Sequence, residues 1–328
     1  MKKLTIKSLW SKFNPFASYS MSPTLVIIYI LMAIFFAIKN PIFIDLKNYQ
    51  VIAINAPILG IVAIGLAAVI LTGNVDLSVG SLVGFISVFS ALMLKNSGMP
   101  ATAVIIIGLL AGIAIGAFNG FVVNYIGVNS IIVTLGMWAT LRGASMIITG
   151  GVVYFKNEKF VEIGRGYVFK VIPNIFLFMM VILAVMYFVL RFTKFGRNIY
   201  LVGANFLSAT AVGVNVKKTK FLTFLISSGF AALAGILLVS QFSSAHYDYG
   251  TGWEFRALTI CIVGGISLSG GRGTLVGLFL ALLILGSMSN GLTLINMPNY
   301  WRSFFDGSVL LLAIIVDSLR VRRMSYST

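Results

Sequence analysis

The side chains that usually perform catalysis or bind metal are scarce in this sequence. It has one histidine, His246, one cysteine, Cys261, and eight Asp and Glu residues among 328. A metal cluster or a nucleophile–base pair needs several such groups close together, and a single cysteine excludes an internal disulfide. We therefore predict neither a catalytic nor a metal site, and we expect Cys261 to be a small packing residue inside an apolar segment.

The sequence also lacks an energy source of its own. No segment matches the phosphate-binding pattern GxxxxGK[ST], and the glycine-rich run GGISLSGGRGT (264–274) has neither the lysine nor the strand–helix context of that loop. We interpret this run as a tight turn between short helices, with Gly264 and Gly265 at a break in a helix.

An aspartate ends an apolar run in the segment LTGNVDLSVGS (71–81). A carboxylate in a membrane span is costly unless it is capped, paired or hydrated. Two interpretations are open. Asp76 caps the next helix at the membrane edge, or Asp76 and Ser78 mark a broken helix near a translocation path, to which Asn119 and Thr134 also contribute.

A buried arginine and two acidic residues form a second polar group. Arg142 lies well inside an apolar span, where an unpaired arginine costs about 2.5–3.5 kcal/mol. It either links helices or contacts substrate, and its candidate partners are Glu254, Asp248 and Asp306. Asp248 and Glu254 lie at the predicted outer mouth of a span, where they either orient an incoming binding protein or belong to a solvated loop.

The composition places these residues in a membrane protein. Hydrophobic residues make up 59% of the chain and charged residues 10%, whereas soluble domains have about 25% charged residues. A helix needs roughly 17–25 apolar residues to cross a bilayer, and backbone groups in lipid must pair within their own segment. We predict an all-α polytopic membrane protein with about ten transmembrane helices, of which the third and eighth are short or broken: 24–44, 51–72, 78–95, 101–126, 130–150, 172–191, 220–241, 256–268, 274–293 and 303–319.

The net charge of +16 would suggest nucleic acid in a soluble protein. Here the cationic residues concentrate in segments that the positive-inside rule places in the cytoplasm, so we predict no nucleic-acid partner. Both termini and the loop 192–220 are predicted to be cytoplasmic, although one span more or fewer would reverse the later loops. The predicted parts are a cytoplasmic amphipathic leader (1–22), the transmembrane domain (23–319) and a cytoplasmic tail (320–328).

Glycine patterns add two expectations. The segments LSVGSLVGF (77–85) and LSGGRGTLVGLF (268–279) are similar, and transporters often contain paired, glycine-interrupted helices in their two halves. In another span, glycines at every fourth position predict close helix packing: Gly108, Gly112, Gly116 and Gly120.

The loop 192–220 interrupts the apolar sequence. It is rich in glycine and small residues, is cationic and has no acidic residue. We predict that it docks a cytoplasmic partner. The alternative is a loop that binds anionic lipid, to which each basic residue contributes about 1 kcal/mol.

Four motifs, in order along the chain, carry a family resemblance. LTGNVDLSVGS resembles the GGxDLSVGS signature of permease subunits of ribose/xylose/galactose-type ABC importers. NSIIVTLGMWATLRGASMIITGG (129–151) resembles the T-L-G-x-x-x-x-x-R-G stretch of that family, and TKFGRNIYLVGAN (193–205) with SATAVGVNV (208–216) resembles its cytoplasmic loop. GTGWEFRALTICIVGGISLSGGRGT (250–274) resembles the GxGxELxAIAAxxxGGxSLxGGxG signature.

The resemblance implies a transmembrane subunit of a bacterial inner-membrane importer. Its implied partners are a cytoplasmic ABC ATPase that binds ATP and Mg, an extracytoplasmic sugar-binding protein, a second permease copy or paralogue, and membrane lipid. No cofactor is implied in this chain. Phe206 and Leu207 stand at positions that are usually polar in the family, which suggests a more apolar grip on the ATPase. The resemblance also implies a short amphipathic helix at about 205–212 that sits in a cleft of the ATPase. The implied ATPase-coupling residues are Gly203, Asn205, Phe206, Leu207, Ala209 and Gly213.

Two other function classes compete with this interpretation. A stand-alone ion-coupled carrier usually places acidic or histidine residues deep in its spans, and such residues are few here. A membrane enzyme or receptor would need a reactive pair or an output domain, and no such feature is visible in the sequence.

Overall fold

The computed structural model describes residues 22–96 and 99–325. The described chain is almost entirely helical, which confirms the predicted fold class. The helical elements are α2 (Ser22–Lys39), η1 (Pro41–Ile44), α3 (Leu46–Leu71), α4 (Val79–Asn96), α5 (Ala101–Phe121), η2 (Val122–Ile126), α6 (Ser130–Thr149), α7 (Glu158–Arg165), α8 (Asn174–Phe192), α9 (Lys194–Ala204), α10 (Phe206–Ala211), α11 (Val216–Phe242), α12 (Trp253–Val263), α13 (Leu275–Leu294) and α14 (Asn299–Ser325).

Strands occur only in two short antiparallel pairs within the described part of the chain. β1 (Val152–Tyr154) pairs antiparallel with β4 (Ser244–His246), with Val153 opposite Ala245. β2 (Tyr167–Val168) pairs with β3 (Ile172–Pro173). The first pair joins two loops that are far apart in the sequence, so it fixes the loop after α11 against the loop after α6.

Every predicted span contains a helix. Seven helices in the described residues are long and apolar enough to cross a bilayer, and the segment Pro23–Lys39 is a shorter apolar helix. The predicted span 256–268 is half helix, because α12 ends at Val263 and a turn follows. The total number of spans remains a prediction.

The terminal predictions are only partly covered by the described residues. Of the leader 1–22, residues 1–21 lie outside them. At the other end, α14 continues to Ser325, so the chain stays helical beyond the predicted boundary at 319, and residues 326–328 lie outside the described part.

The centre of the molecule is formed by α3, whose residues from Pro57 to Leu71 are all buried, and by α11, which packs against α3, α4 and α5. The predicted glycine face lies in the α5–α11 contact. A Cβ at Gly108 would lie 3.2 Å from Ile236 Cδ1, and one at Gly120 would lie 3.1 Å from Phe224 Cβ. The two helix backbones can approach closely because these side chains are missing.

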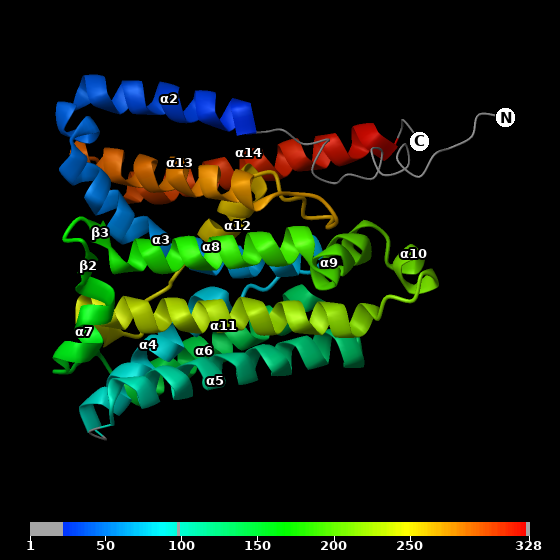
Figure 1. Ribbon diagram of the computed structural model, residues 1–328, viewed down its shortest axis with the longest axis horizontal. Helices are drawn as coiled ribbons and strands as arrows, with labels where there is room; N and C mark the ends of the chain where they lie inside the picture. The colour runs from blue at the N-terminus through cyan, green and yellow to red at the C-terminus, as the bar shows by residue number, and fades with distance from the viewer. Residues whose placement is uncertain (1–21, 97–98, 326–328) are drawn as a thin grey trace.

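The long helices lie roughly side by side, and the two ends of the bundle differ (Figure 1). The helices α9 and α10 lie at the same end as the last turns of α14, and we call this the α10 end. The helix α7 and the β2–β3 pair lie at the opposite end, the α7 end.

Two non-helical turns interrupt the bundle. The first break (residues 72–78) joins α3 to α4, and the second break (residues 264–274) joins α12 to α13. The two similar segments noted in the sequence thus occupy equivalent places, each at the start of a long helix. Positive φ angles at Gly73 (+78°) and Gly270 (+82°) allow the sharp turns.

Candidate functional site

The first break contains a carboxylate that is completely shielded from solvent. Asp76 is 0% exposed. Its Oδ1 accepts hydrogen bonds from the Ser78 backbone N–H (3.0 Å) and from Ser78 Oγ (2.6 Å), and its Oδ2 accepts one from Ser227 Oγ of α11 (3.3 Å). The capping interpretation and the broken-helix interpretation therefore both apply to Asp76. It caps the turn before α4, and this turn is a break between two helices. Its position is the protein interior rather than an exposed edge.

The other polar residues predicted near the path lie around this carboxylate. Asn119 Nδ2 donates to Ser78 Oγ (3.1 Å), and the Leu77 backbone N–H donates to Thr134 Oγ1 (3.1 Å). The Val75 N–H donates to Ser130 Oγ (3.3 Å). Side chains from α5, α6 and α11 thus hold the first break, and a movement of any of these helices would disturb it.

The second break is held by a residue that the sequence analysis did not single out. Asp317 of α14 accepts hydrogen bonds at Oδ2 from Ser267 Oγ and from the Leu268 backbone N–H, both at 3.2 Å. Gly264 has no room for a side chain, because a Cβ would lie 2.6 Å from Leu278 Cα, and Gly265 has a φ of +85°. No local sequence pattern predicts a contact across 50 residues.

The two breaks meet at a glycine joint, which consists of Gly73, Gly203, Gly270 and Gly271. The Gly271 N–H donates to the carbonyl oxygen of Leu71 at 2.9 Å. A Cβ at Gly203 would overlap that same oxygen, and one at Gly270 would lie 2.8 Å from Gly73 N. Gly203 belongs to α9, so the joint connects the cytoplasmic loop predicted from the sequence to both breaks through backbone contacts.

The predicted amphipathic helix of this loop is α10. Asn205 caps it by accepting a hydrogen bond from the Ser208 N–H (3.0 Å). Phe206 and Leu207 are 57% and 67% exposed, whereas Ala209 is buried. The turn that follows contains Gly213 at a φ of +82°. The helix thus presents two large apolar side chains at the α10 end.

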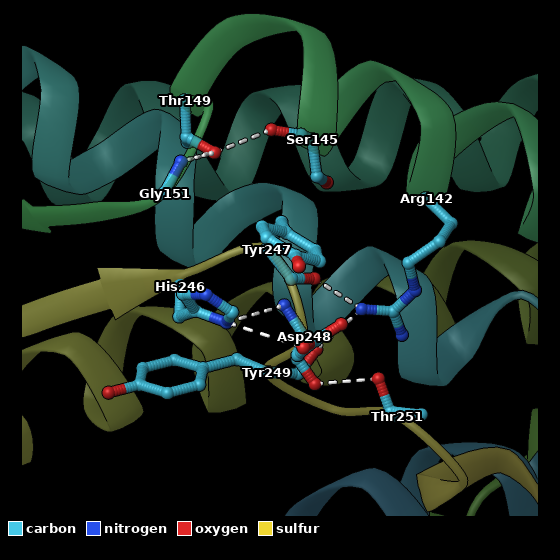
Figure 2. Close-up of polar contacts among 9 residues, drawn as sticks. All are labelled: Arg142, Ser145, Thr149, Gly151, His246, Tyr247, Asp248, Tyr249 and Thr251. Carbon is cyan, nitrogen blue, oxygen red and sulfur yellow. Dashed lines mark hydrogen bonds and ion pairs between the residues drawn. The ribbon is translucent and has the colours of Figure 1, made fainter.

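At the α7 end, Arg142 of α6 fastens the loop that follows β4 (Figure 2). Its Nη1 donates to the carbonyl oxygens of Tyr247 and, at 3.2 Å, of Tyr249. In the same loop the Asp248 N–H donates to His246 Nδ1 (3.2 Å), and Thr251 Oγ1 donates to the Asp248 carbonyl oxygen (2.6 Å). Arg142 therefore links a helix to a loop, through backbone carbonyl oxygens and not through a second helix.

The three acidic residues considered as partners of Arg142 lie in different environments. Asp306 pairs with Arg256, with 3.1 Å between Oδ2 and Nε. Glu254 and Asp248 lie close enough to influence Arg142 electrostatically, but neither salt bridge among the described residues involves Arg142. Asp248 is exposed, but Glu254 is 2% exposed. In this conformation Glu254 is thus neither a docking residue nor part of a solvated loop, because it packs against Gly80 of α4.

Polar atoms near Glu254 lack hydrogen-bond partners. Among the described residues, Trp138 Nε1, Arg142 Nη2 and Glu254 Oε2 are buried without a partner. Trp138 also lies close enough to influence the Glu254 carboxylate. Unpaired buried polar atoms are uncommon in folded proteins, and these three lie on α6 and α12 beside the loop that Arg142 holds.

Comparison with known proteins identifies the family. The family model described as "Branched-chain amino acid transport system / permease component" matches residues 48–314. The Autoinducer 2 import system permease protein LsrC of Salmonella typhi is 33% identical over 294 residues, which cover 90% of this chain and 84% of that protein. The Probable ABC transporter permease protein YphD of Escherichia coli is 32% identical over 301 residues, which cover 92% and 90%.

Another similar protein is LsrC of Yersinia pseudotuberculosis, which is 34% identical over 281 residues that cover 83% of this chain and 78% of that protein. No solved structure matches the chain. The family model spans both breaks, the glycine joint, α9 and α10, so the match includes the features described above. This chain is a member of the permease component family of branched-chain amino acid-type transport systems.

Proposed function

We propose that this chain is the transmembrane subunit of an ATP-driven, binding-protein-dependent importer of a monosaccharide or a related small sugar-like solute. The observation that carries the proposal is the permease family match over residues 48–314, together with relatives named as permeases of an import system and of an ABC transporter. Since the chain is a permease subunit, ATP hydrolysis belongs to a separate subunit. Ribose, xylose and galactose are the solutes to test first.

The α10 end is the proposed contact with the ATPase. Phe206 and Leu207 are exposed apolar side chains at the tip of a cationic loop, and exposed apolar groups beside polar ones are typical of protein interfaces. The predicted cytoplasmic placement of both termini and of residues 192–220 agrees with this assignment, because α10 and the last turns of α14 lie at one end (Figure 1).

The glycine joint is the proposed route by which the ATPase moves the permease. Backbone atoms in direct contact leave little space to absorb a displacement, because protein interiors are densely packed. A push on α10 and α9 would therefore shift Gly203 against Leu71 and Gly271 and move both breaks together. Rigid-body movement of this kind is a common form of switching.

The α7 end is the proposed outer mouth. Asp248 presents an exposed carboxylate to the binding protein, and Arg142 holds its loop in place. If the loop is displaced, Trp138, Arg142 and Glu254 would offer an aromatic face and charged hydrogen-bond groups to a polyol. A second permease copy or paralogue completes the proposed path.

The stand-alone ion-coupled carrier is the weaker alternative. The buried Asp76 is the residue that could bind an ion in such a carrier. However, the family is defined as one component of a transport system, and the exposed α10 surface has no role in a carrier that works alone.

Extraction of the tagged chain from native bacterial membranes with mild detergent, followed by mass spectrometry, tests the proposal. The wild-type chain should retain an ABC ATPase, and the double substitution Phe206→Ser/Leu207→Ser should lose it. Phe169→Ser is the control, because Phe169 is also an exposed aromatic residue (88%) but lies between β2 and β3 at the α7 end. A folded wild-type chain that retains no ATPase and moves sugar in liposomes without ATP would contradict the proposal.

A further inference from the structure

A polar cavity of about 420 Å³ lies beside the first break. Its walls come from the turn after α3, from η2 and the segment that joins it to α6, from the first turns of α6 and α11, and from Leu268 of the second break. The polar lining side chains include Asn74, Asn124, Asn129, Ser130 and Lys220. This volume is large enough for a small organic ligand rather than for a single water molecule.

The residues that line this cavity carry a positive charge and no negative charge. Lys220 is the one charged residue of the lining. It is partly buried, and neither of the salt bridges found in the described residues involves it. The carboxylate nearest in sequence to the lining, that of Asp76, already accepts hydrogen bonds from Ser78 and Ser227. The ammonium group therefore lacks a counter-charge in the described part of the protein, which makes an anion the favoured occupant.

Hydrogen-bond donors support the same conclusion. Asn74 Nδ2 is buried and has no hydrogen-bond partner in the described residues. The 20-residue helix α6 begins at the cavity with Ser130, and its N-terminus brings the positive end of the helix dipole. The lysine, the unpaired amide and the helix N-terminus come from three separate segments of the chain, and the fold brings them together at this cavity.

We propose that this cavity binds a phosphate-bearing anion at the cytoplasmic face of the permease. Phosphate is the anion that a lysine ammonium and a helix N-terminus commonly bind together. Its source is either a soluble sugar phosphate or the headgroup of an anionic phospholipid. The ligand would join the first break to α6 and α11 and so stabilise the conformation described here. This site is independent of the identity of the transported solute.

The test uses the full chain in lipid nanodiscs and measures thermal unfolding and ligand affinity. One arm adds glucose 6-phosphate to phosphatidylcholine discs, with glucose as the uncharged control. The other arm compares phosphatidylglycerol discs with phosphatidylcholine discs. Wild type should be stabilised by the phosphate ester, by the anionic lipid, or by both, and the responding arm identifies the source.

Substitutions then link the response to the cavity. Lys220→Gln should weaken binding by about tenfold or more, the loss expected for a charge-assisted hydrogen bond, and Lys220→Arg should retain most of it. The matched control is Lys218→Gln, because Lys218 is exposed on the same helix. Asn74→Ala is a second variant that weakens binding without changing charge. The proposal is overturned if neither anion stabilises wild type, or if Lys220→Gln responds as Lys218→Gln does.

Discussion

The two breaks solve the same structural problem with residues from different places. In both, one apolar helix ends inside the bundle before the next begins, and the turn between them contains backbone N–H groups that need partners. The first break supplies its own acceptor, Asp76, which is fully buried. The second break receives its acceptor from α14, where Asp317 binds Ser267 and Leu268.

The two acceptors also differ in burial, and burial affects how strongly each break is held in its conformation. Asp76 is surrounded by protein, so its hydrogen bonds have no competition from water. Asp317 is only partly buried, and its donors can bind water when it is absent. The first break should therefore be the stiffer of the two, although both meet at the glycine joint.

The largest effect is expected where both breaks meet. Gly203→Ala should lower the free energy of unfolding by about 2–4 kcal/mol or prevent accumulation, because its Cβ would overlap Leu71. Thermal unfolding of the purified chain measures this. Gly143→Ala is the control, since a Cβ there meets nothing within 4 Å. Equal unfolding temperatures for the two variants would show that the joint does not need close contact.

The next largest loss of stability is expected at the first break. Asp76→Ala should cost about 3 kcal/mol, because the N–H and hydroxyl of Ser78 and the hydroxyl of Ser227 lose their acceptor in a buried place. Asp76→Asn keeps one oxygen acceptor and should cost less. Denaturant unfolding compares the two, and an Asn variant weaker than the Ala variant would argue against the capping role.

A smaller effect is expected at the second break. Asp317→Ala should lower the free energy of unfolding by about 1 kcal/mol, because the Ser267 hydroxyl and the Leu268 N–H can form hydrogen bonds with water instead. The same unfolding measurement applies, with Asp317→Asn as the variant that retains an acceptor. If Asp317→Ala proves more damaging than Asp76→Ala, the order of stiffness assigned to the two breaks is reversed.

An effect about as small as that of Asp317→Ala tests backbone strain alone. Gly73→Ala leaves an ordinary contact of 3.7 Å to Ser269 O but keeps a φ of +78°, which costs an L-residue about 1–2 kcal/mol. We expect about 1 kcal/mol after local relaxation. If Gly73→Ala lowers the free energy of unfolding as much as Gly203→Ala does, then lack of space for a side chain at Gly73, and not its positive φ, is what requires glycine there.

The sequence predicted what depends on local composition. Long apolar runs predicted the helices, and the glycines at every fourth position predicted close packing of α5, although not its partner α11. The family resemblance of the loop predicted the helix at 205–212, which is α10. Asp76 was also found, because its capping partner Ser78 is two residues away.

Contacts across the chain were not predictable in the same way. Asp317 reaches the second break over about 50 residues, and Glu254 is buried because Gly80 of a distant helix makes room for it. The cavity beside Lys220 combines segments from four parts of the chain. Such features depend on tertiary packing, which no local pattern contains.

The most direct test of the account is the number of solute molecules imported per ATP hydrolysed. The permease, its ATPase and its binding protein are reconstituted in liposomes, and wild type is compared with Gly270→Ala, which adds a methyl group at the joint 2.8 Å from Gly73 N. We predict that the folded variant keeps its ATPase and hydrolyses ATP but imports several-fold less solute per ATP. An unchanged ratio would contradict transmission of movement through the glycine joint.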